Sequence, residues 1–364
     1  MKRFFECTIP TTACNLKCSY CYVIQENRRK NEKADFLYSP EYIGKALSVE
    51  RLGGVSFISM TAAGETLLPK EISKITHEIL KQGHFVNITT NGTLSKRFDE
   101  IIDFDEKFLK KLNFSFSFHY LELLRTNNMD VFFENIHKIR QAGCSFVLQV
   151  NLCDEYMPYW EEIKKISLKE TGAFPQVALT RDETFRHIDG KYRILTKDVE
   201  NYCKVGDEMN SPLFEFTCKN FMVTRKEFCY AGEWSAKINL GTGEMTGCYG
   251  NGVCQNIFKN LDVPIQFKAI GNNCCFQYCF NSSHFMSLGV IPELITPSYG
   301  DLRNRKEAGW YSKQMEQFLS EKLYDDNKQC TGFGKNVANF EMKFRCLLHS
   351  SIRLATQIKD KLFK

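Results

Sequence analysis

The order of strand-like and helix-like segments limits what this chain of 364 residues can fold into more than any other feature. Helical periodicity is seen at 71–83 and at 129–143, where Phe132, Ile136 and Ile139 share one face and a glycine ends the pattern. Apolar runs rich in β-branched and aromatic residues, typical of strands, occur at 4–9, 55–61, 84–90, 112–118, 145–152 and 174–180. Six such alternations predict parallel βαβ units, as a partial barrel or an open doubly wound sheet. In either fold the chemistry belongs at the carboxyl ends of the strands.

Polar residues gather directly after these strands, at the edge where chemistry is expected. In chain order they are Cys14, Cys18 and Cys21; Ala63, Gly64, Glu65 and Thr66; Thr90, Asn91 and Gly92; Ser115, Ser117 and His119; Gln149, Asn151, Cys153 and Asp154; and Arg181, Asp182 and Glu183. Polar residues near strand ends also satisfy backbone groups, so both a binding role and a structural role are open for each serine and amide.

The segment CNLKCSYC places Cys14, Cys18 and Cys21 on one loop in C-x3-C-x2-C spacing. Structural zinc sites usually close a tetrahedron with two separated pairs of ligands, which this loop does not offer. An iron–sulfur cluster normally takes four cysteines, and no fourth lies nearby. The triplet therefore favours a [4Fe–4S] cluster with one iron open to a ligand that is not protein, with structural zinc as the alternative.

This loop resembles the cluster-binding loop of the radical S-adenosylmethionine (radical SAM) superfamily, and the resemblance extends over about residues 1–185. It implies a partial (β/α)6 TIM-like barrel, SAM bound at the open iron, and reductive cleavage of SAM to methionine and a 5′-deoxyadenosyl radical. That radical takes a hydrogen atom from a substrate C–H bond, while the protein positions the partners and excludes water. Tyr20 and Tyr22 are candidates to pack over the cluster or the adenine.

The same resemblance implies a set of SAM contacts. Ala63-Gly64-Glu65-Thr66 resembles the Gly-Gly-Glu-Pro segment that holds the SAM amino group, with alanine and threonine as departures at its ends. Thr90-Asn91-Gly92 resembles the end of the third strand in that family. The remaining implied contacts, to the ribose, carboxylate or adenine, are Ser115, Ser117, Gln149 and Asn151.

The second half of the chain does not continue the alternation of strand-like and helix-like segments. Residues 184–215 are charged and irregular, as in a linker. Strand-like segments at 235–240 and 244–249 then flank Gly241-Thr242-Gly243, which predicts a hairpin with Cys229 before it and Cys248 at its far end. The sequence thus divides into a barrel over 1–185, a linker over 186–215, an auxiliary domain over 216–300 and a helical tail over 301–364.

The spacing from Cys229 through Gly243 to Cys248 resembles the opening of SPASM and twitch domains, which carry auxiliary [4Fe–4S] clusters. The later cysteine signature of a full SPASM domain is absent, so the resemblance implies a shorter, twitch-like domain with one auxiliary cluster. Its expected ligands are Cys229, Cys248, Cys279 and either Cys274 or Cys275. Zinc is an alternative here, Cys218, Cys254 and Cys203 are spare candidates, and Cys7, Cys144, Cys330 and Cys346 are expected to be small buried residues.

Composition limits the cellular compartment and the kinds of ligand that are expected for this chain. Sixteen cysteines without a signal peptide or an apolar run of about 18 residues favour the cytoplasm and metal ligation over disulfides. A net charge of +5 suits an anionic ligand but not a nucleic-acid binder. The tail segment 341–364 has a basic amphipathic pattern (Phe344, Leu347, Leu348, Ile352 and Leu354) that could meet a membrane or a partner, and packing on its own domain is expected.

The substrate is not named by the sequence. The first strand begins near residue 4, which leaves no room for a leader-peptide module and favours a sugar or nucleotide-sugar that is epimerised or dehydrogenated. A peptide or protein is the alternative substrate, and an iron–sulfur electron carrier or sensor is the non-enzymatic alternative. A flavodoxin or ferredoxin would supply electrons. Cys153 is a candidate to return a hydrogen atom to the substrate radical, against a purely structural role.

Overall fold

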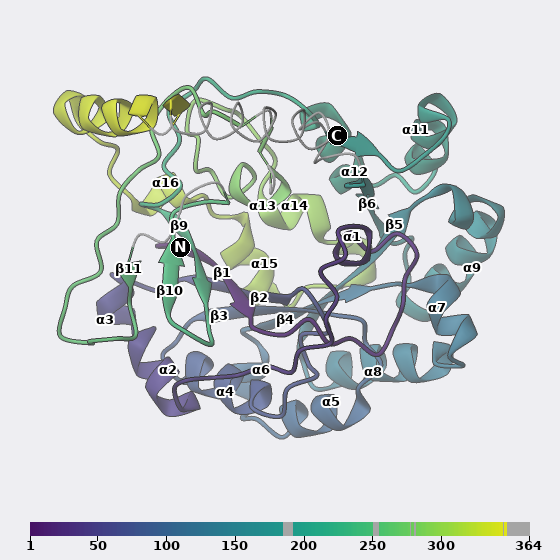
Figure 1. The fold of residues 1–364 in the computed structure, drawn as a ribbon. Helices are drawn as coiled ribbons and strands as arrows, with labels where there is room; N and C mark the ends of the chain where they lie inside the picture. Colours follow the sequence, from purple (N-terminus) through teal and green to yellow (C-terminus); the bar gives the residue numbers. More distant parts are fainter. Residues whose placement is uncertain (185–191, 250–254, 277, 280–281, 345, 348–364) are drawn as a thin grey trace.

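Six parallel strands form the centre of the molecule, as predicted. The computed structural model describes residues 1–184, 192–249, 255–276, 278–279, 282–344 and 346–347. The strands pair in chain order, each parallel to the next, and curve into a partial barrel (Figure 1). They are β1 (Phe4–Ile9), β2 (Phe57–Ala62), β3 (Phe85–Thr90), β4 (Leu112–Ser117), β5 (Ser145–Leu152) and β6 (Gln176–Leu179).

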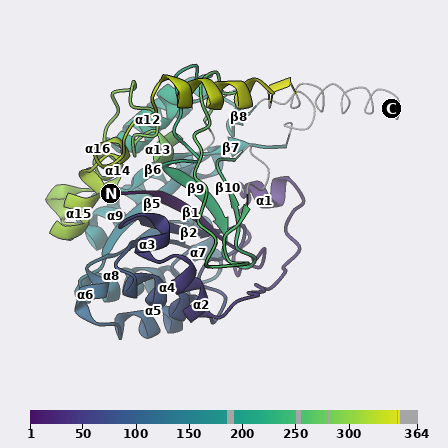
Figure 2. The same ribbon diagram turned by 90° about the vertical axis from the view of Figure 1, so that its left-hand side faces the viewer.

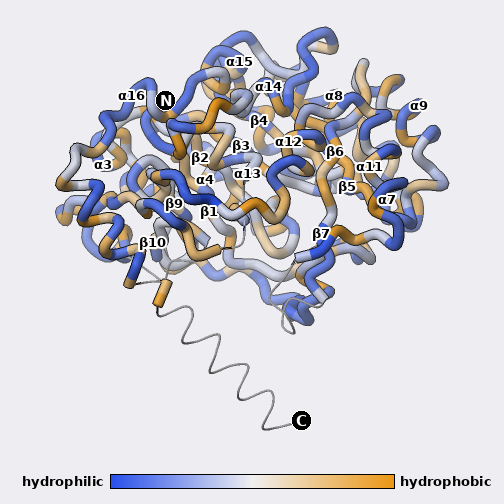
Figure 3. The backbone as a smooth tube through the Cα atoms, turned by 90° about the horizontal axis from the view of Figure 1, so that it is seen from above, coloured by the Kyte–Doolittle hydropathy of each residue, from blue (hydrophilic) through white to orange (hydrophobic). Residues whose placement is uncertain are grey.

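Helices cover the outer face of this sheet (Figure 1). The helix predicted at 129–143 is α8 (Met129–Gln141), and its predicted face of Phe132, Ile136 and Ile139 is buried. The helix predicted at 71–83 is α4 (Ile72–Lys81). The others in this half are α1 (Tyr22–Gln25), α2 (Pro40–Ala46), α3 (Val49–Leu52), α5 (Ser95–Ile102), α6 (Glu106–Leu109), α7 (Tyr120–Arg125), η1 (Asp154–Tyr159) and α9 (Trp160–Thr171). Figure 3 shows the hydrophobic strands at the centre and the hydrophilic segments at the periphery.

The predicted hairpin is present and continues the barrel sheet. β9 (Ser235–Asn239) and β10 (Glu244–Thr246) are antiparallel, and β11 (Gln255–Asn256) follows β10. Gly243 has φ +78°, and a Cβ there would lie 2.4 Å from the side chain of Phe258, so the turn requires glycine. β9 also pairs with β1 in parallel, with Lys237 opposite Glu6. The division of the chain into separate domains stays a prediction.

The segment expected to be an irregular linker is largely helical in its described part, so that description is wrong. It contains α11 (Val199–Asp207) and the start of α12 (Pro212–Asn220), after the short pair β7 (Arg181–Asp182) and β8 (Arg193–Ile194). The Ser211 hydroxyl caps α12 by accepting a hydrogen bond from Phe214 N at 3.2 Å. The same hydroxyl accepts from Val177 N of β6 at 2.9 Å, which fixes α12 to the edge of the barrel.

The region after residue 281 closes the amino end of the barrel. It contains α13 (Ser282–Phe285), α14 (Tyr299–Arg303), η2 (Lys306–Ala308), α15 (Lys313–Ser320) and α16 (Leu323–Asp326). The Phe318 ring stacks on Phe85 at the start of β3, with ring centroids 3.7 Å apart. The Tyr299 ring meets the edge of Phe57 at the start of β2, with centroids 5.1 Å apart. These aromatic contacts fill the amino end, so only the carboxyl ends of the strands remain open for a site.

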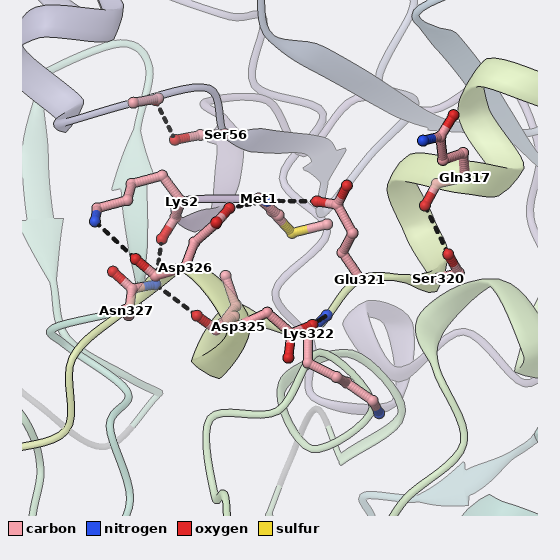
Figure 4. A network of polar contacts seen from close by, with 12 residues as sticks. Met1, Lys2, Ser56, Gln317, Ser320, Glu321, Lys322, Asp325, Asp326 and Asn327 are labelled. Carbon is pink, nitrogen blue, oxygen red and sulfur yellow. Dashed lines mark hydrogen bonds and ion pairs between the residues drawn. The ribbon is translucent and has the colours of Figure 1, made fainter.

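Polar contacts tie the first residues to the end of this region (Figure 4). The amino group of Met1 forms ion pairs with Glu321 and Asp326. The Asn327 amide donates to the carbonyl of Lys2 at 2.7 Å. The residues that precede β1 are thereby anchored to the segment around α16. None of the helices in the described part of the chain has the length and apolar character of a membrane-spanning segment.

Beyond α16, the chain forms a further helix over 332–344. The expectation that the apolar side chains of the tail pack on their own domain is wrong for Phe344 and Leu347, which are 60% and 68% exposed. The rest of that predicted stripe, Leu348, Ile352 and Leu354, lies outside the described residues.

Candidate active site

The three cysteines of the C-x3-C-x2-C loop lie together at the carboxyl end of β1. Cys18 is buried, and Cys14 and Cys21 are half-buried. Burial raises the pKa of the Cys18 thiol above its usual range, and the nearby Cys21 and Cys14 raise it further. The three thiols of the loop therefore lie close enough to interact electrostatically.

A cavity of about 710 Å³ opens beside this loop. Cys14 and Cys18 line it, together with Lys17 and Arg29, and the other lining residues are Ser19, Ile24, Asn27 and Asn31. The Arg29 guanidinium also donates to the Cys14 carbonyl at 2.5 Å. The cavity has the size of a small-molecule site, and the positively charged side chains of Lys17 and Arg29 line it together with the thiols of Cys14 and Cys18.

The loop after β2 braces the start of the cysteine loop. Gly64 N donates to Thr11 O at 3.0 Å, and Glu65 N donates to Ala13 O at 2.9 Å. A Cβ on Gly64 would lie 2.0 Å from the Ala13 carbonyl oxygen, which is far inside van der Waals contact. Glycine at this position therefore lets two backbone segments touch immediately before Cys14.

Glu65 joins the ends of β2 and β3. Its buried carboxylate accepts hydrogen bonds from Leu67 N at 3.0 Å, the Thr90 hydroxyl at 2.6 Å and Asn91 N at 2.8 Å. Burial raises the pKa of this carboxyl, and the hydrogen bonds oppose that shift. Both oxygens thus serve the fold of the site, and a direct contact of Ala63, Gly64 or Glu65 with SAM stays a prediction.

Asn91 reaches the cysteine loop directly. Its side-chain amide donates to Asn15 Oδ1 at 2.8 Å and lies 3.9 Å from the Cys14 sulfur. The predicted clustering of the segments after the first three strands is therefore seen in the geometry.

The residues predicted from β4 and β5 share the inner face of the sheet. Ser117 lies directly opposite Gln149 in the strand register, and both are half-buried. The Ser115 hydroxyl donates to Asn87 Oδ1 at 2.9 Å, and the Asn151 amide donates to the Thr180 hydroxyl at 3.3 Å. Ser115 and Asn151 thus already have partners in the fold, and their roles toward SAM stay predictions.

A hydrogen-bonded group of buried side chains links the cysteine loop to the segments after β4 and β5. This group could not be predicted from the sequence. The Tyr20 hydroxyl lies 2.5 Å from Nδ1 of His119, and the Tyr156 hydroxyl donates to Tyr20 at 3.3 Å. Burial lowers the pKa of His119 to about 4, so the imidazole is neutral at physiological pH. Tyr20 and His119 stood out singly as loop and strand-end residues, but nothing in the sequence indicated that they pair.

Cys153 lies beside this hydrogen-bonded group, and its charge would be felt by both Tyr20 and Tyr156. The side chain is 3% exposed, and burial raises the pKa of its thiol to about 12. The residue therefore keeps its S–H proton at neutral pH, as a hydrogen-atom donor must. Its access to a substrate is not tested, and the donor role stays a prediction.

A second group of cysteines gathers around Cys229. An isolated bridge between Cys229 and Gly271, with both backbone hydrogen bonds at 3.1 Å, brings the hairpin to the segment that carries the later cysteines. Burial raises the pKa of Cys229, and the nearby Cys248, Cys279 and Cys274 raise it further. These are three of the expected ligands together with one of the two alternatives for the fourth.

Cys275 packs with Cys229 and Cys248 against the cluster of Ala231, Ile270 and Met342, and it also contacts Cys346. It is hydrogen-bonded to Cys346, which follows the helix over 332–344 and lies 3.7 Å from the Asn273 carbonyl oxygen. Cys346 was expected to be an isolated buried residue, and that prediction is wrong. Cys7 and Cys144 are buried as expected, whereas Cys330 is half-buried. Cys218 pairs with Cys203, and Cys254 lies outside the described residues.

The spacing of the cysteines bears on the zinc alternatives. In the described ranges, no three Cys, His, Asp or Glu side chains converge tightly enough to hold one metal ion. The thiolates of a [4Fe–4S] cube each bind a different iron, so they lie farther apart than the ligands of one zinc ion. The described thiols of the two cysteine groups therefore form no site for a single metal ion as they stand.

Comparisons with known proteins concern the family and the fold of the chain. Residues 8–166 match the radical SAM superfamily. A stretch of 100 residues, 26% of the chain, is 38% identical to a probable GTP 3′,8-cyclase of Methanococcus maripaludis and covers 31% of that protein. SuiB of Streptococcus suis aligns with a TM-score of 0.50 and 15% identity over 73% of this chain and 66% of its own. Native anSMEcpe with bound AdoMet and Cp18Cys peptide aligns over 96% of this chain and 99% of its own, with 14% identity and a TM-score of 0.44.

These matches have a limited reach. The chain spans less than one third of the cyclase and about two thirds of SuiB. At 15% identity, the likeness to SuiB concerns the fold.

Proposed function

Residues 8–166 form a radical SAM domain, and from this premise we propose that the protein is a radical SAM enzyme whose catalytic [4Fe–4S] cluster is held by Cys14, Cys18 and Cys21. When bound, the reduced cluster and SAM supply a 5′-deoxyadenosyl radical that takes a hydrogen atom from substrate. The observation that carries the proposal is that three thiols of one loop lie together beside a cavity of about 710 Å³. A fully protein-ligated cluster would need a fourth cysteine, and this loop offers three.

The residues around the loop have distinct tasks in this proposal. Gly64 and Glu65 fix the backbone before Cys14, and Asn91 fixes the loop from the side of β3. Lys17 and Arg29 line the cavity, where their positive charge would suit the carboxylate of SAM, although none of the proposed SAM contacts that follow β2 to β5 is among the lining residues. Ser115, Ser117, Gln149 and Asn151 remain the proposed contacts to the ribose, carboxylate or adenine, because the inner face of β4 and β5 carries them together.

We further propose one auxiliary [4Fe–4S] cluster with Cys229, Cys248, Cys274 and Cys279 as ligands. Their mutual proximity supports this set, and Cys274 is preferred because it, unlike Cys275, is among the thiols that raise the pKa of Cys229. Such a cluster would pass electrons between the substrate and a flavodoxin or ferredoxin.

The proposed substrate is a sugar or nucleotide-sugar, in a setting taken to be the cytoplasm. Support comes from polar side chains around the buried Glu6 of β1, contributed by Lys237 of β9 and by Tyr249 beyond β10. The Tyr249 hydroxyl donates to both carboxylate oxygens of Glu6, at 2.5 and 2.7 Å, and the Lys237 ammonium lies 3.8 Å from the same carboxylate. Clustered donors and acceptors of this kind suit a hydroxylated ligand. The cyclase relative is named for a nucleotide. A peptide is the alternative, and SuiB was solved bound to the precursor peptide SuiA.

Iron content and electron paramagnetic resonance of anaerobically reconstituted protein test these assignments. Wild type should hold about eight irons per chain, and the triple variant Cys14→Ala/Cys18→Ala/Cys21→Ala about four, with loss of the SAM-induced change in the spectrum. The matched control Cys330→Ala, outside both cysteine groups, should behave as wild type.

Two results would decide against parts of the proposal. A wild-type spectrum that SAM does not change would favour the electron carrier or sensor. Stoichiometric zinc without iron in the triple variant would remove the auxiliary cluster.

A further inference from the structure

Buried side chains on one face of the helix over 332–344 attach it to the rest of the molecule. Ala338 and Met342 are 7% and 3% exposed, and Met342 packs with Ala231 and Ile270 beside the second cysteine group. Asn339 Oδ1 accepts a hydrogen bond from Asn272 N at 2.9 Å. The helix therefore lies along the outer edge of the molecule with a fixed orientation (Figure 2).

The opposite face of the same helix is apolar and exposed to solvent. Its members, called here the Phe stripe, are Phe333, Val337, Phe340 and Phe344 of this helix and Leu347 just beyond it, with exposed fractions of 81%, 45%, 75%, 60% and 68%. Their spacing of four, three, four and three residues places them within about 80° around a helix, roughly opposite Ala338 and Met342. Single exposed apolar residues need no explanation, but a contiguous row of five marks an interaction surface.

In the sequence, the positive charge of the chain is concentrated in the stretch that contains this helix. Residues 328–364 carry eight Lys or Arg and two Asp or Glu, a net charge of +6. Since the whole chain has a net charge of +5, residues 1–327 have a net charge of −1. The Phe stripe thus belongs to the basic part of an otherwise nearly neutral protein, and Lys343 lies on its helix next to Phe344.

We propose that the Phe stripe binds the surface of an anionic lipid bilayer, with the helix lying parallel to the membrane plane. An apolar row with bulky aromatic side chains and basic neighbours has the properties of an interfacial helix. The inference is independent of the proposed function, because it uses no residue of either cysteine group.

A second copy of the chain fits this surface less well than lipid does. Pairing two identical stripes would bring the basic residues of both helices together. The acidic residue on the described helix, Glu341, already lies 3.6 Å from Lys268 of its own chain, so it offers little compensation. Charge complementarity therefore favours an anionic surface over a copy of the same helix.

Sedimentation with vesicles tests the proposal on the anaerobically reconstituted protein. We expect binding to vesicles of mixed phosphatidylglycerol and phosphatidylcholine, weaker binding at high salt, and little binding to phosphatidylcholine alone. Phe340→Ser/Phe344→Ser should weaken the association by at least about tenfold, and Lys343→Gln by about fivefold. The control Leu124→Ser/Leu168→Ser changes side chains that are 47% and 51% exposed elsewhere, and should bind as wild type.

Iron content and thermal unfolding should be unchanged in all these variants, since each replaced side chain is exposed. Equal binding by wild type and the Phe340→Ser/Phe344→Ser variant would overturn the proposal. So would the absence of vesicle binding. If light scattering shows that wild type is a dimer and the Phe340→Ser/Phe344→Ser variant is a monomer, the proposal is also overturned, in favour of a protein interface.

Discussion

Replacing Gly64 by alanine tests how the cysteine loop is held. The added Cβ would stand 2.0 Å from the Ala13 carbonyl oxygen, whereas ordinary contact begins near 3.4 Å, so one backbone must move by 3.4 − 2.0 = 1.4 Å. That movement strains two hydrogen bonds, from Gly64 N to Thr11 O at 3.0 Å and from Glu65 N to Ala13 O at 2.9 Å. Overpacking costs about 1–3 kcal/mol and each of the two hydrogen bonds about 1 kcal/mol, so we expect a local loss of about 3–5 kcal/mol.

The functional effect should exceed the effect on global stability, because the displaced residues directly precede Cys14. A misplacement of about 1 Å at a reacting site can lower a rate about 100-fold. The assay is iron content together with the rate of 5′-deoxyadenosine formation from SAM under reducing, anaerobic conditions. The matched control is Gly332→Ala, because a Cβ there meets nothing within 4 Å. If Gly64→Ala and Gly332→Ala hold the same iron and react at the same rate, the bracing role of the β2 loop is wrong.

Three further predictions concern the buried groups. Burial lowers the pKa of His84 and His119 from 6.5 to about 4. Each neutral imidazole therefore stabilises the folded protein above pH 6.5, and this stabilisation is lost as the pH falls toward 4. At pH 5 the free energy of unfolding should be lower by about 2 kcal/mol per histidine. Urea unfolding at pH 7 and pH 5 should show a smaller difference in His119→Gln than in wild type, and an unchanged difference would refute this. Phe318→Ala should lower the free energy of unfolding by about 3–5 kcal/mol, since its ring is buried against Phe85; a loss below about 1 kcal/mol would contradict the closure of the barrel by α15. With the true substrate in deuterated water, Cys153→Ala should lose solvent deuterium from the product carbon while 5′-deoxyadenosine still forms, and equal labelling at an equal rate would assign the hydrogen donor elsewhere.

The parts of the fold that local patterns govern could be predicted from the sequence. The six strands follow from runs of β-branched and aromatic residues, and α4 and α8 follow from apolar periodicity. The cysteine loop could be found because Cys14, Cys18 and Cys21 are adjacent in the chain, so their proximity needs no tertiary information.

The remainder depends on contacts between distant segments. The pairing of β9 with β1 joins Lys237 to Glu6 across more than half of the chain, and no local signal encodes it. Whether Cys274 or Cys275 is the better candidate for the fourth cluster ligand depends on tertiary contacts such as the one between Cys275 and Cys346, which a distant segment of the chain supplies. The aromatic closure of the barrel by α14 and α15 was likewise not foreseen, because an apolar helical pattern does not name the surface it will cover.

The most direct test of the central assignment is the amount of 5′-deoxyadenosine formed from SAM by the anaerobically reconstituted and chemically reduced protein. The account predicts that wild type forms 5′-deoxyadenosine together with methionine, and that Cys14→Ala/Cys18→Ala/Cys21→Ala forms none, because the catalytic cluster loses all of its protein ligands. Formation of 5′-deoxyadenosine by this triple variant at the wild-type rate would contradict the account.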